Sequence, residues 1–503
     1  MKMIKTVGIA LLLVSATING WSFCGFYVAK ADATLFNNKS EVILVRNGNY
    51  TVITMGSDFQ GDVKDFAMVV PVPVVLKRSD INVVDRSLFE RLDAYSAPRL
   101  AEYYDDNLCG RRWEEEVQED ANYPSSMGVT SKMAEASENK HYHVTIEAQY
   151  TVGEYDIILL SATESDGLKQ WLTDNGYKIP NKAEKVLSPY IKSNMKFFVV
   201  KVNLEEMKKT GYNELRPIQI RFEHPKFMLP LRLGMANSRG SQDMIVYAFT
   251  PEGRVECANY RTMKVPSDRN IPLLVQQDFG NFYKRVFERA WQREGKNCVF
   301  LEYAWNVSPS WGGVKCDPCV GPPPMFQDFS LAGVNWNNQN NVSNVFFTRL
   351  HVRYDQEHFP MDLQFQVTPN TESFQARYII THPAPVYDGF NCDWGQEYLL
   401  RLHNKRKLEM DEWENLTGMR SADRWSYISQ FDQYLLKLPT EWIQEKKDVE
   451  NPVKEMNKGS FWPDSVSVFH LDTVDAKDRR FELFFGLLGF LILFIIISRR
   501  WEK

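Results

Sequence analysis

The chain has 503 residues, of which 44% are hydrophobic and 13% aromatic, so it is large and apolar enough to form two or three domains with packed cores. Its formal charge of −5 is mild for this length, and the sequence has no basic stripe with interleaved aromatic residues. A disordered stalk is therefore excluded, and nucleic acid is not an expected partner.

A secretory signal peptide is predicted over residues 1–22. Lys2 and Lys5 precede an unbroken apolar run at residues 7–18, and small residues follow where a signal peptidase cleaves. The mature chain is expected to begin near Phe23 and to be exported.

A single transmembrane helix is predicted over residues 481–498. Its core at residues 483–497 is apolar on every helical face, and the full segment is roughly 27 Å long, just enough for a bilayer core of about 30 Å. The basic tail at residues 499–503 indicates the cytoplasmic side. We therefore expect a single-pass membrane protein with its large N-terminal part extracytoplasmic. The marginal length of the apolar segment and the terminal arginines also fit a bacterial sorting signal that a membrane protease removes.

Residues 23–270 are predicted to form a β-rich domain. Asn-Gly-Asn at residues 47–49 separates two β-branched runs and predicts a hairpin. Residues 66–73 form a further strand that two prolines confine to the edge or end of a sheet. The charged residues 111–140 are interpreted as a mobile polar loop, and more strands follow with a short helix at residues 167–177.

A second β-rich part is predicted over residues 271–390. It opens with an amphipathic helix at residues 272–295, which we expect to bridge two sheets, and it contains a surface insertion at residues 306–344. Residues 218–233 and 350–367 share one order of features, namely strand, acidic-His turn, proline and strand. This repeated order of features is the basis for expecting two related halves.

The remaining extracytoplasmic part, residues 391–480, is predicted to be a helical region and spacer. Helical patterns cover residues 396–408 and 412–435, and a polar stretch with two prolines follows at residues 437–477. The expected fold class is α+β, with mainly antiparallel β-sheets in two related halves, a bridging helix, a helical region and the C-terminal transmembrane helix.

The seven cysteines bear on redox chemistry. An exported chain should oxidise some of them, and at most three disulfides can form. Cys316 and Cys319 have the CxxC spacing, which suits a structural bridge, a redox pair or half of a zinc site. A proline-rich run follows instead of a helix, and there is no second CxxC, so the structural bridge is favoured.

Two groups of residues could bind a metal. His141 and His143 share one face of a strand, and Asp355, Glu357 and His358 form an acidic turn. In both places solvent-facing side chains are the favoured interpretation. No cofactor is predicted, and a divalent cation is the ligand that these groups suggest.

Three tryptophans of the insertion and its borders, Trp305, Trp311 and Trp336, could stack on sugars or fill a partner's pocket. Such residues more often cover a small satellite core. A carbohydrate-binding surface therefore stays open as an alternative.

Several phrases together resemble one bacterial family, the proteins grouped as domain of unknown function 2330. They are FAMVVPVP at 66–73, GEYD at 153–156, WLTDNGY at 171–177, KFMLP at 226–230, CDPC at 316–319 and TRLHVRY at 348–354. The resemblance covers roughly residues 24–400. It implies a secretory signal and, in many members, a C-terminal membrane segment in the bacterial envelope. It implies no catalytic residues.

The expected function is a non-enzymatic, envelope-tethered binding or assembly protein whose partner is another envelope protein or a surface polymer. The sequence contains no nucleophile elbow, HExxH helix or Walker loop. The alternatives are a metal-dependent hydrolase, a thiol oxidoreductase and a carbohydrate-binding surface module.

Overall fold

The computed structural model describes residues 26–27, 36–37, 40–56, 59–60, 67–106, 144–175, 183–210, 215–235, 240–308, 322–338, 342–386 and 390–444. The chain divides into two compact units, Met1–Leu436 and Lys437–Lys503, and every sheet of the described residues belongs to the first unit.

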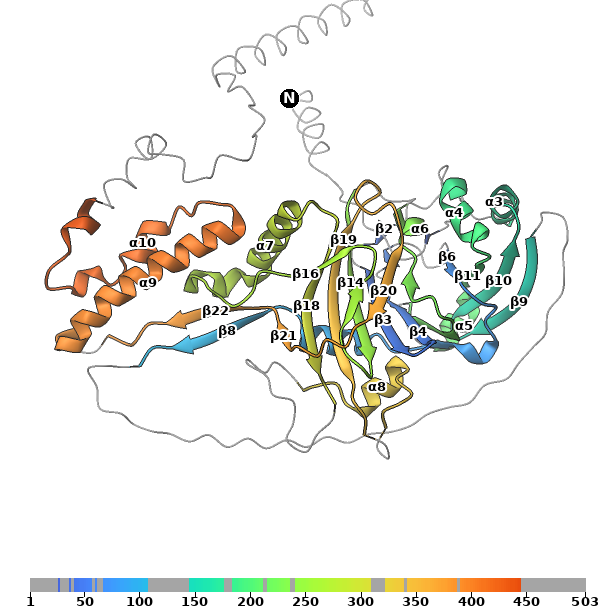
Figure 1. Ribbon diagram of the computed structural model, residues 1–503, viewed down its shortest axis with the longest axis horizontal. Coiled ribbons are helices and arrows are strands. Elements are labelled where there is room, and N and C mark those ends of the chain that lie inside the picture. The colour runs from blue at the N-terminus through green and yellow to red at the C-terminus, as the bar shows by residue number, and fades with distance from the viewer. Residues whose placement is uncertain are drawn as a thin grey trace, which may run out of the picture. The chain divides into compact units, whose positions relative to one another are not determined.

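A nine-stranded sheet forms the centre of the fold (Figure 1). Its order is β16-β18-β19-β14-β3-β4-β12-β7, and β21 pairs with β18. Neighbours are antiparallel except for β14 with β3 and β16 with β18. The strands are β3 (Ser40–Asn47), β4 (Tyr50–Gly56), β7 (Ile81–Val83), β12 (Ile218–Glu223), β14 (Gln242–Thr250), β16 (Arg261–Lys264), β18 (Cys298–Asn306), β19 (Phe346–Tyr354) and β21 (Phe374–Gln375).

An antiparallel five-stranded sheet packs on one face of this central sheet. Its order is β1-β6-β11-β10-β9, and one apolar cluster joins Val70 and Phe198 to Val42 and Val246 of the central sheet. Burial of such side chains contributes about 1.5–3 kcal/mol each. The strands are β1 (Phe26–Tyr27), β6 (Ala67–Val72), β9 (Val144–Val152), β10 (Tyr155–Ala162) and β11 (Lys196–Val202).

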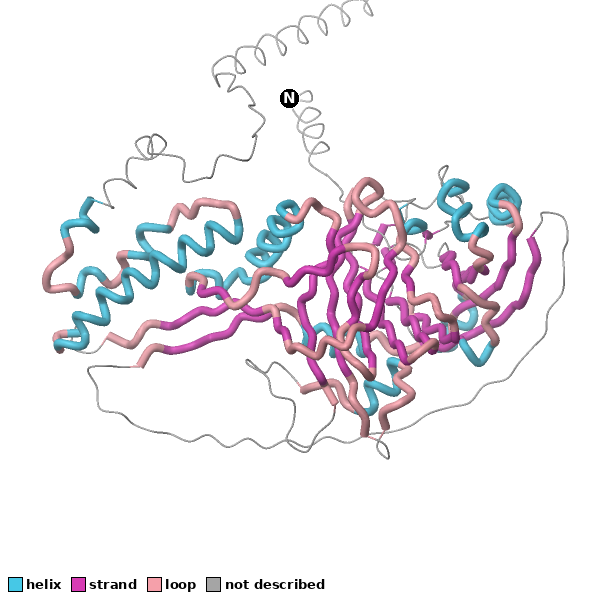
Figure 2. Tube along the Cα trace, viewed as in Figure 1, coloured by secondary structure: helices cyan, strands magenta, loops and turns pink. Residues whose placement is uncertain are grey.

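Helices cover the outer faces of both sheets (Figure 2). Leu168 and Leu187 pack on the five-stranded sheet from α3 (Ser165–Asp174) and α4 (Ala183–Lys192). Leu92 and Phe329 pack on the central sheet from α2 (Ser87–Ser96) and α8 (Phe326–Ala332). The central sheet is thus covered on both sides, which is why β14 is buried at every position.

A smaller parallel sheet carries the C-terminal helices. It has the order β17-β22-β8, from β8 (Arg99–Tyr104), β17 (Arg269–Asn270) and β22 (Arg377–His382). Tyr378 of this sheet packs with Phe282 of α7 (Phe279–Arg293) and Leu416 of α9 (Asp393–Thr417). The remaining short elements are β2 (Phe36–Asn37), β5 (Phe59–Gln60), β13 (Met228–Leu229), β15 (Val255–Cys257), β20 (Leu363–Val367), α5 (Leu204–Thr210), α6 (Arg232–Met235), α10 (Arg424–Ile428), η2 (Arg78–Asp80), η3 (Leu273–Asp278) and η5 (Asp432–Tyr434).

The structure confirms an α+β fold with mainly antiparallel sheets. The hairpin at residues 47–49 joins β3 to β4, and the helix predicted at residues 272–295 occurs as η3 followed by α7. Pro71 is tolerated because β1 pairs only with Met68 and Val69, so the missing N–H lies past the end of that pairing.

Two local predictions are corrected. The two helices expected at residues 396–408 and 412–435 are one continuous α9 followed by the short α10, because no helix breaker stands between Leu408 and Glu412. The strand expected at residues 228–233 ends at Leu229 and gives way to α6.

Within the described ranges, no helix is long and apolar enough to cross a membrane. The predicted signal peptide at residues 1–22, the polar loop at residues 111–140 and the transmembrane segment at residues 481–498 all lie outside those ranges.

Candidate functional site

The acidic turn considered as a metal site is a locally bonded turn. Asp355 Oδ1 accepts hydrogen bonds from the backbone N–H groups of Glu357 (3.0 Å) and His358 (2.9 Å). His358 Nδ1 lies 2.7 Å from the same oxygen, and Ser241 donates to Oδ2 over 3.1 Å. Both carboxylate oxygens are therefore engaged within the protein. Among the described residues, no three His, Cys, Asp or Glu side chains are grouped to hold a metal ion.

The other predicted site residues are only partly placed. His141, His143, Cys316, Cys319 and Trp311 lie outside the described residues. Trp305 and Trp336 are half-buried and pack against the cluster under α2 and α8. The indole N–H of Trp336 donates to the carbonyl of Asn344 over 2.8 Å, so this ring is fixed against the protein.

The most concentrated polar chemistry lies on β19. Three cationic side chains, Arg349, His351 and Arg353, alternate with the apolar Leu350 and Val352. Because side chains alternate across a strand, the cations share one face and the apolar residues share the other. Leu350 and Val352 enter the cluster between the two sheets, and the cations face α2 and α7.

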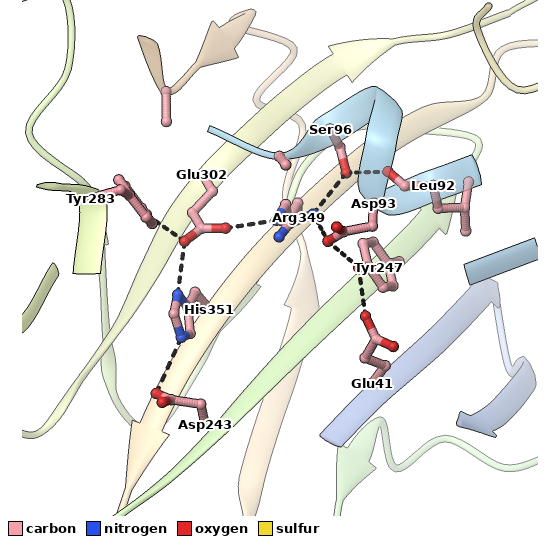
Figure 3. A network of polar contacts seen from close by, with 12 residues as sticks. Glu41, Leu92, Asp93, Ser96, Asp243, Tyr247, Tyr283, Glu302, Arg349 and His351 are labelled. Atoms are coloured by element: carbon pink, nitrogen blue, oxygen red, sulfur yellow. Dashed lines mark hydrogen bonds and ion pairs between the residues drawn. The ribbon is translucent and has the colours of Figure 1, made fainter. Parts of the chain in front are cut away.

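Glu302 of β18 lies between two of these cations, Arg349 and His351 (Figure 3). Its Oε2 is 2.6 Å from Arg349 Nε, and its Oε1 is 2.8 Å from His351 Nδ1. The hydroxyl of Tyr283 on α7 donates to Oε1 over 2.5 Å. Glu302 is fully buried, so three donors replace the water that its carboxylate gives up.

The network extends through Asp243 of β14. His351 Nε2 lies 3.2 Å from Asp243 Oδ1, and Arg353 donates to both carboxylate oxygens of Asp243 (2.8 and 2.9 Å). Arg353 also pairs with Glu288 of α7. This part of the network therefore ties β14 and β19 to α7.

On the other side, Arg349 reaches α2. Its Nη1 lies 2.8 Å from Asp93 Oδ1 and 3.3 Å from Ser96 Oγ (Figure 3). Tyr247 of β14 donates to the same Asp93 oxygen over 2.9 Å and lies 3.2 Å from Glu41. Arg349 is 4% exposed, so all of these contacts lie in a region of low dielectric constant.

The burial and charges of this network shift several pKa values. Burial raises the pKa of Glu302, but His351 and Arg349 outweigh it and lower that pKa to about 2. Burial likewise opposes ionisation of Asp243, yet His351 and Arg353 hold its pKa well below its ordinary value. Burial lowers the pKa of His351, but Glu302 and Asp243 raise it above its ordinary value.

Helix α7 covers the cations with aromatic rings. Phe287 stacks on the imidazole of His351 with centroids 3.8 Å apart. The Arg353 guanidinium lies 5.0 Å from the Phe287 centroid and 5.6 Å from that of Trp291. The indole N–H of Trp291 donates to the carbonyl of Arg353 over 3.1 Å. The helix is thereby held to the sheet by polar and aromatic contacts together.

Every cation of this cluster is paired within the protein. Arg349, His351 and Arg353 bond the carboxylates listed here: Asp93, Asp243, Glu288 and Glu302. The arrangement is suited to clamping α2, the central sheet and α7 together.

Sequence reasoning identified the strand but missed the cluster. TRLHVRY at residues 348–354 has the pattern of a strand, and its three cations at alternate positions indicate one charged face. The acidic partners are distant, since Glu302, Asp243 and Asp93 lie 47, 108 and 256 residues from the cation that each one bonds. Such pairings cannot be read from one sequence.

The GEYD phrase at residues 153–156 supplies a second buried pair. Glu154 is fully buried. Its two carboxylate oxygens accept hydrogen bonds from Nε, Nη2 and the backbone N–H of Arg216 (2.6 to 3.3 Å). Gly153 adopts φ +57° in the β9–β10 turn, a conformation that favours glycine. The phrase therefore encodes a turn and the anchor that fixes it.

Two cysteines that the sequence could not assign are free buried thiols, Cys257 and Cys298. Burial raises the pKa of both, that of Cys298 to about 11. Thiols of this kind react slowly because the thiolate is scarce. Five of the seven cysteines remain, so at most two disulfides can form within the chain, one fewer than the predicted maximum.

Comparisons with known proteins identify the family. The family described as an uncharacterized protein conserved in bacteria, domain of unknown function 2330, matches residues 19–366. This range contains β19 and both acidic partners on β14 and β18. No curated protein and no solved structure matches the chain. The match covers more than half of the sequence, and the chain belongs to this family.

Proposed function

We propose that this protein is a non-enzymatic binding or assembly protein, tethered to the bacterial cell membrane with its large N-terminal part extracytoplasmic. Its partner in this proposal is another envelope component, a protein or a surface polymer. The supporting observation is the distribution of exposed apolar side chains. Of the sixteen large hydrophobic residues exposed in the described ranges, five lie between Trp394 and Leu436, within the first compact unit. Exposed apolar side chains that recur along one stretch of chain favour an interaction surface.

The buried network of Glu302, Asp243 and the three cations of β19, here called the clamp, supports the same proposal. Its reactive groups, Glu302 and His351 among them, bond one another and lie under α7. A body of two packed sheets held in this way is a rigid support for a binding surface. In this proposal, the TRLHVRY segment on β19 stabilises the sheets, and the helices after residue 390 contact the partner.

The finer architecture belongs to this proposal. We infer that residues 481–498 span the membrane and that the two β-rich parts are related. The structure supports the relationship because the strands that follow the two matching turns, β13 and β20, pair with each other through Met228 with Gln364 and Leu229 with Leu363. A shared ancestry of the two parts would place equivalent segments side by side.

Crosslinking in native membranes tests the function. The full chain is crosslinked in cells, purified under denaturing conditions and analysed by mass spectrometry. We expect one or a few envelope components to be captured reproducibly. Leu408→Ala, which truncates a side chain that is 68% exposed, should reduce the capture, whereas Val342→Ala, at a residue 56% exposed elsewhere, should not. Capture of nothing above a mock sample would refute the proposal.

A further inference from the structure

Helix α9 has two halves of different character. The first, residues 394–408, carries three exposed apolar side chains, Trp394 (65%), Leu400 (36%) and Leu408 (68%). It also carries four cations and one acid, whereas residues 409–417 carry four acids, no cation and no exposed large apolar residue. A basic half with exposed Trp and Leu is the composition of segments that lie on a membrane surface.

Two of the exposed apolar residues, Trp394 and Leu408, lie along one side of the helix with Arg401, whereas Leu400 lies about 100° further around it. Trp394, Arg401 and Leu408 are seven residues apart, so they lie nearly in line over about 21 Å. The positions three residues further on are polar, namely Glu397, Asn404 and Asp411. A helix that forms a coiled coil with a partner helix needs apolar residues at both sets of positions, and only one set has them in α9. Separate apolar anchors with a cation between them suit the boundary between lipid headgroups and acyl chains.

The opposite side of the helix is fixed to the protein. Leu399 and Leu402 are buried, and His403 pairs with Asp432 (2.9 Å). Near the start of the helix, the hydroxyl of Tyr398 donates to Asp105 over 3.0 Å. Trp394 and Leu408 therefore cannot turn into the core without breaking these contacts.

The charges of the first half divide between the core and the surface. Arg406 is 2% exposed and bonds the carbonyl of Tyr427, so it faces inward. Lys405 lies 3.2 Å from Asp105, and Arg401 lies 3.9 Å from Glu397 at the surface. The Arg401 pair is exposed and contributes little in water, so an anionic headgroup can replace Glu397 as its partner.

The chain leads from this helix toward the proposed membrane span. Between residue 444, the last described, and residue 481 there are 36 residues, which reach at most roughly 130 Å in any conformation. The family match ends at residue 366, so α9 lies outside the part of the chain that it covers. We propose that residues 394–408 of α9 dock on the anionic outer surface of the bilayer that holds the tether. This inference rests on the proposed function and names lipid as one of its partners.

Photocrosslinking of the full chain tests this inference. A photoreactive amino acid replaces Leu408 in one sample and Val342 in a control, and each protein is reconstituted in phosphatidylcholine vesicles with or without phosphatidylglycerol. We expect lipid adducts at position 408 to exceed those at position 342 several-fold, and to be more abundant with phosphatidylglycerol. Arg401→Glu, at an exposed residue, should lower the yield at position 408 while the melting temperature stays unchanged.

The outcomes separate this inference from the proposed function. Adducts of position 408 with a second polypeptide instead of lipid would overturn the membrane docking and leave the binding function standing. A yield at position 408 no higher than at position 342 would also overturn the docking, whatever the pull-down shows. A chain that washes off the vesicles with carbonate would contradict the tether, and the docking with it.

Discussion

Nδ1 of His351 lies 2.8 Å from a carboxylate oxygen of Glu302, and the opposite ring nitrogen of the same imidazole lies 3.2 Å from Asp243. A neutral imidazole has one N–H and can donate only once. With both carboxylates ionised, both hydrogen bonds require the imidazolium. The buried bridge therefore holds a proton as well as three side chains, and α7 rests on it through Phe287.

Removing the charge of Glu302 should destabilise the protein strongly. Glu302→Gln leaves Arg349 and His351 buried with less negative charge beside them, and breaking a buried pair costs about 3–5 kcal/mol. Denaturant unfolding of variant and parent measures the loss. The control is Glu372→Gln, whose exposed carboxylate pairs with Lys264 and should hardly matter. Equal losses in the two variants would show that Glu302 is not a clamp.

The clamp should be most stabilising between about pH 4.5 and 6.5. The pKa of His351 is raised from 6.5, so the stability from its bound proton is complete below 6.5 and is lost as the pH rises through the folded pKa. The pKa of Glu302 falls from 4.5 to about 2, so its contribution is complete above 4.5 and is lost as the pH falls through 2. Unfolding of the parent and of His351→Gln, measured from below pH 4.5 to well above pH 6.5, gives the difference in stability. A difference that does not shrink above pH 6.5 would contradict the bridge.

Local patterns predicted the elements that depend on neighbouring residues. Asn-Gly-Asn predicts the β3–β4 hairpin, because Gly48 can adopt φ +55° without strain. The apolar stripe at helical spacing predicts α7. The order of strands could not be predicted. β3 and β14 pair in parallel although their paired residues, such as Ser40 and Met244, are 204 residues apart. Both strands are apolar enough to fit several positions in a sheet.

The candidate site is difficult to predict from the sequence because it too depends on residues that are far apart in the chain. The turn of Asp355 and His358 was found because its residues are adjacent in sequence, and its favoured interpretation was a solvated turn. The cations of β19 hold other elements in place only because folding brings Asp93, Asp243 and Glu302 next to them. A spacing within one strand carries no information about partners that folding brings from elsewhere.

The two buried thiols should be unreactive in the native protein. Burial raises the pKa of Cys257 and brings that of Cys298 to about 11, so little thiolate exists near neutral pH. Titration with a thiol reagent at pH 8 should count both only after unfolding in guanidinium. Cys298→Ala should lower the count by one in the unfolded chain and leave the native count unchanged. A lower native count would place Cys298 within reach of the reagent.

Two glycines with nearly the same backbone conformation should respond differently to alanine. Gly48 (φ +55°) has no atom within 4 Å of an added Cβ, so Gly48→Ala should cost only the left-handed strain of about 1–2 kcal/mol. At Gly153 (φ +57°) the added Cβ would lie 3.0 Å from Arg216 Nη2 and 3.2 Å from Val83 Cγ2. That nitrogen donates to Glu154 over 2.6 Å, so Gly153→Ala should push Arg216 away from a buried carboxylate and cost about 1–3 kcal/mol more. Denaturant midpoints of the two variants isolate the extra cost. Equal midpoints would mean that Arg216 moves without penalty and that the pair with Glu154 does not anchor the turn.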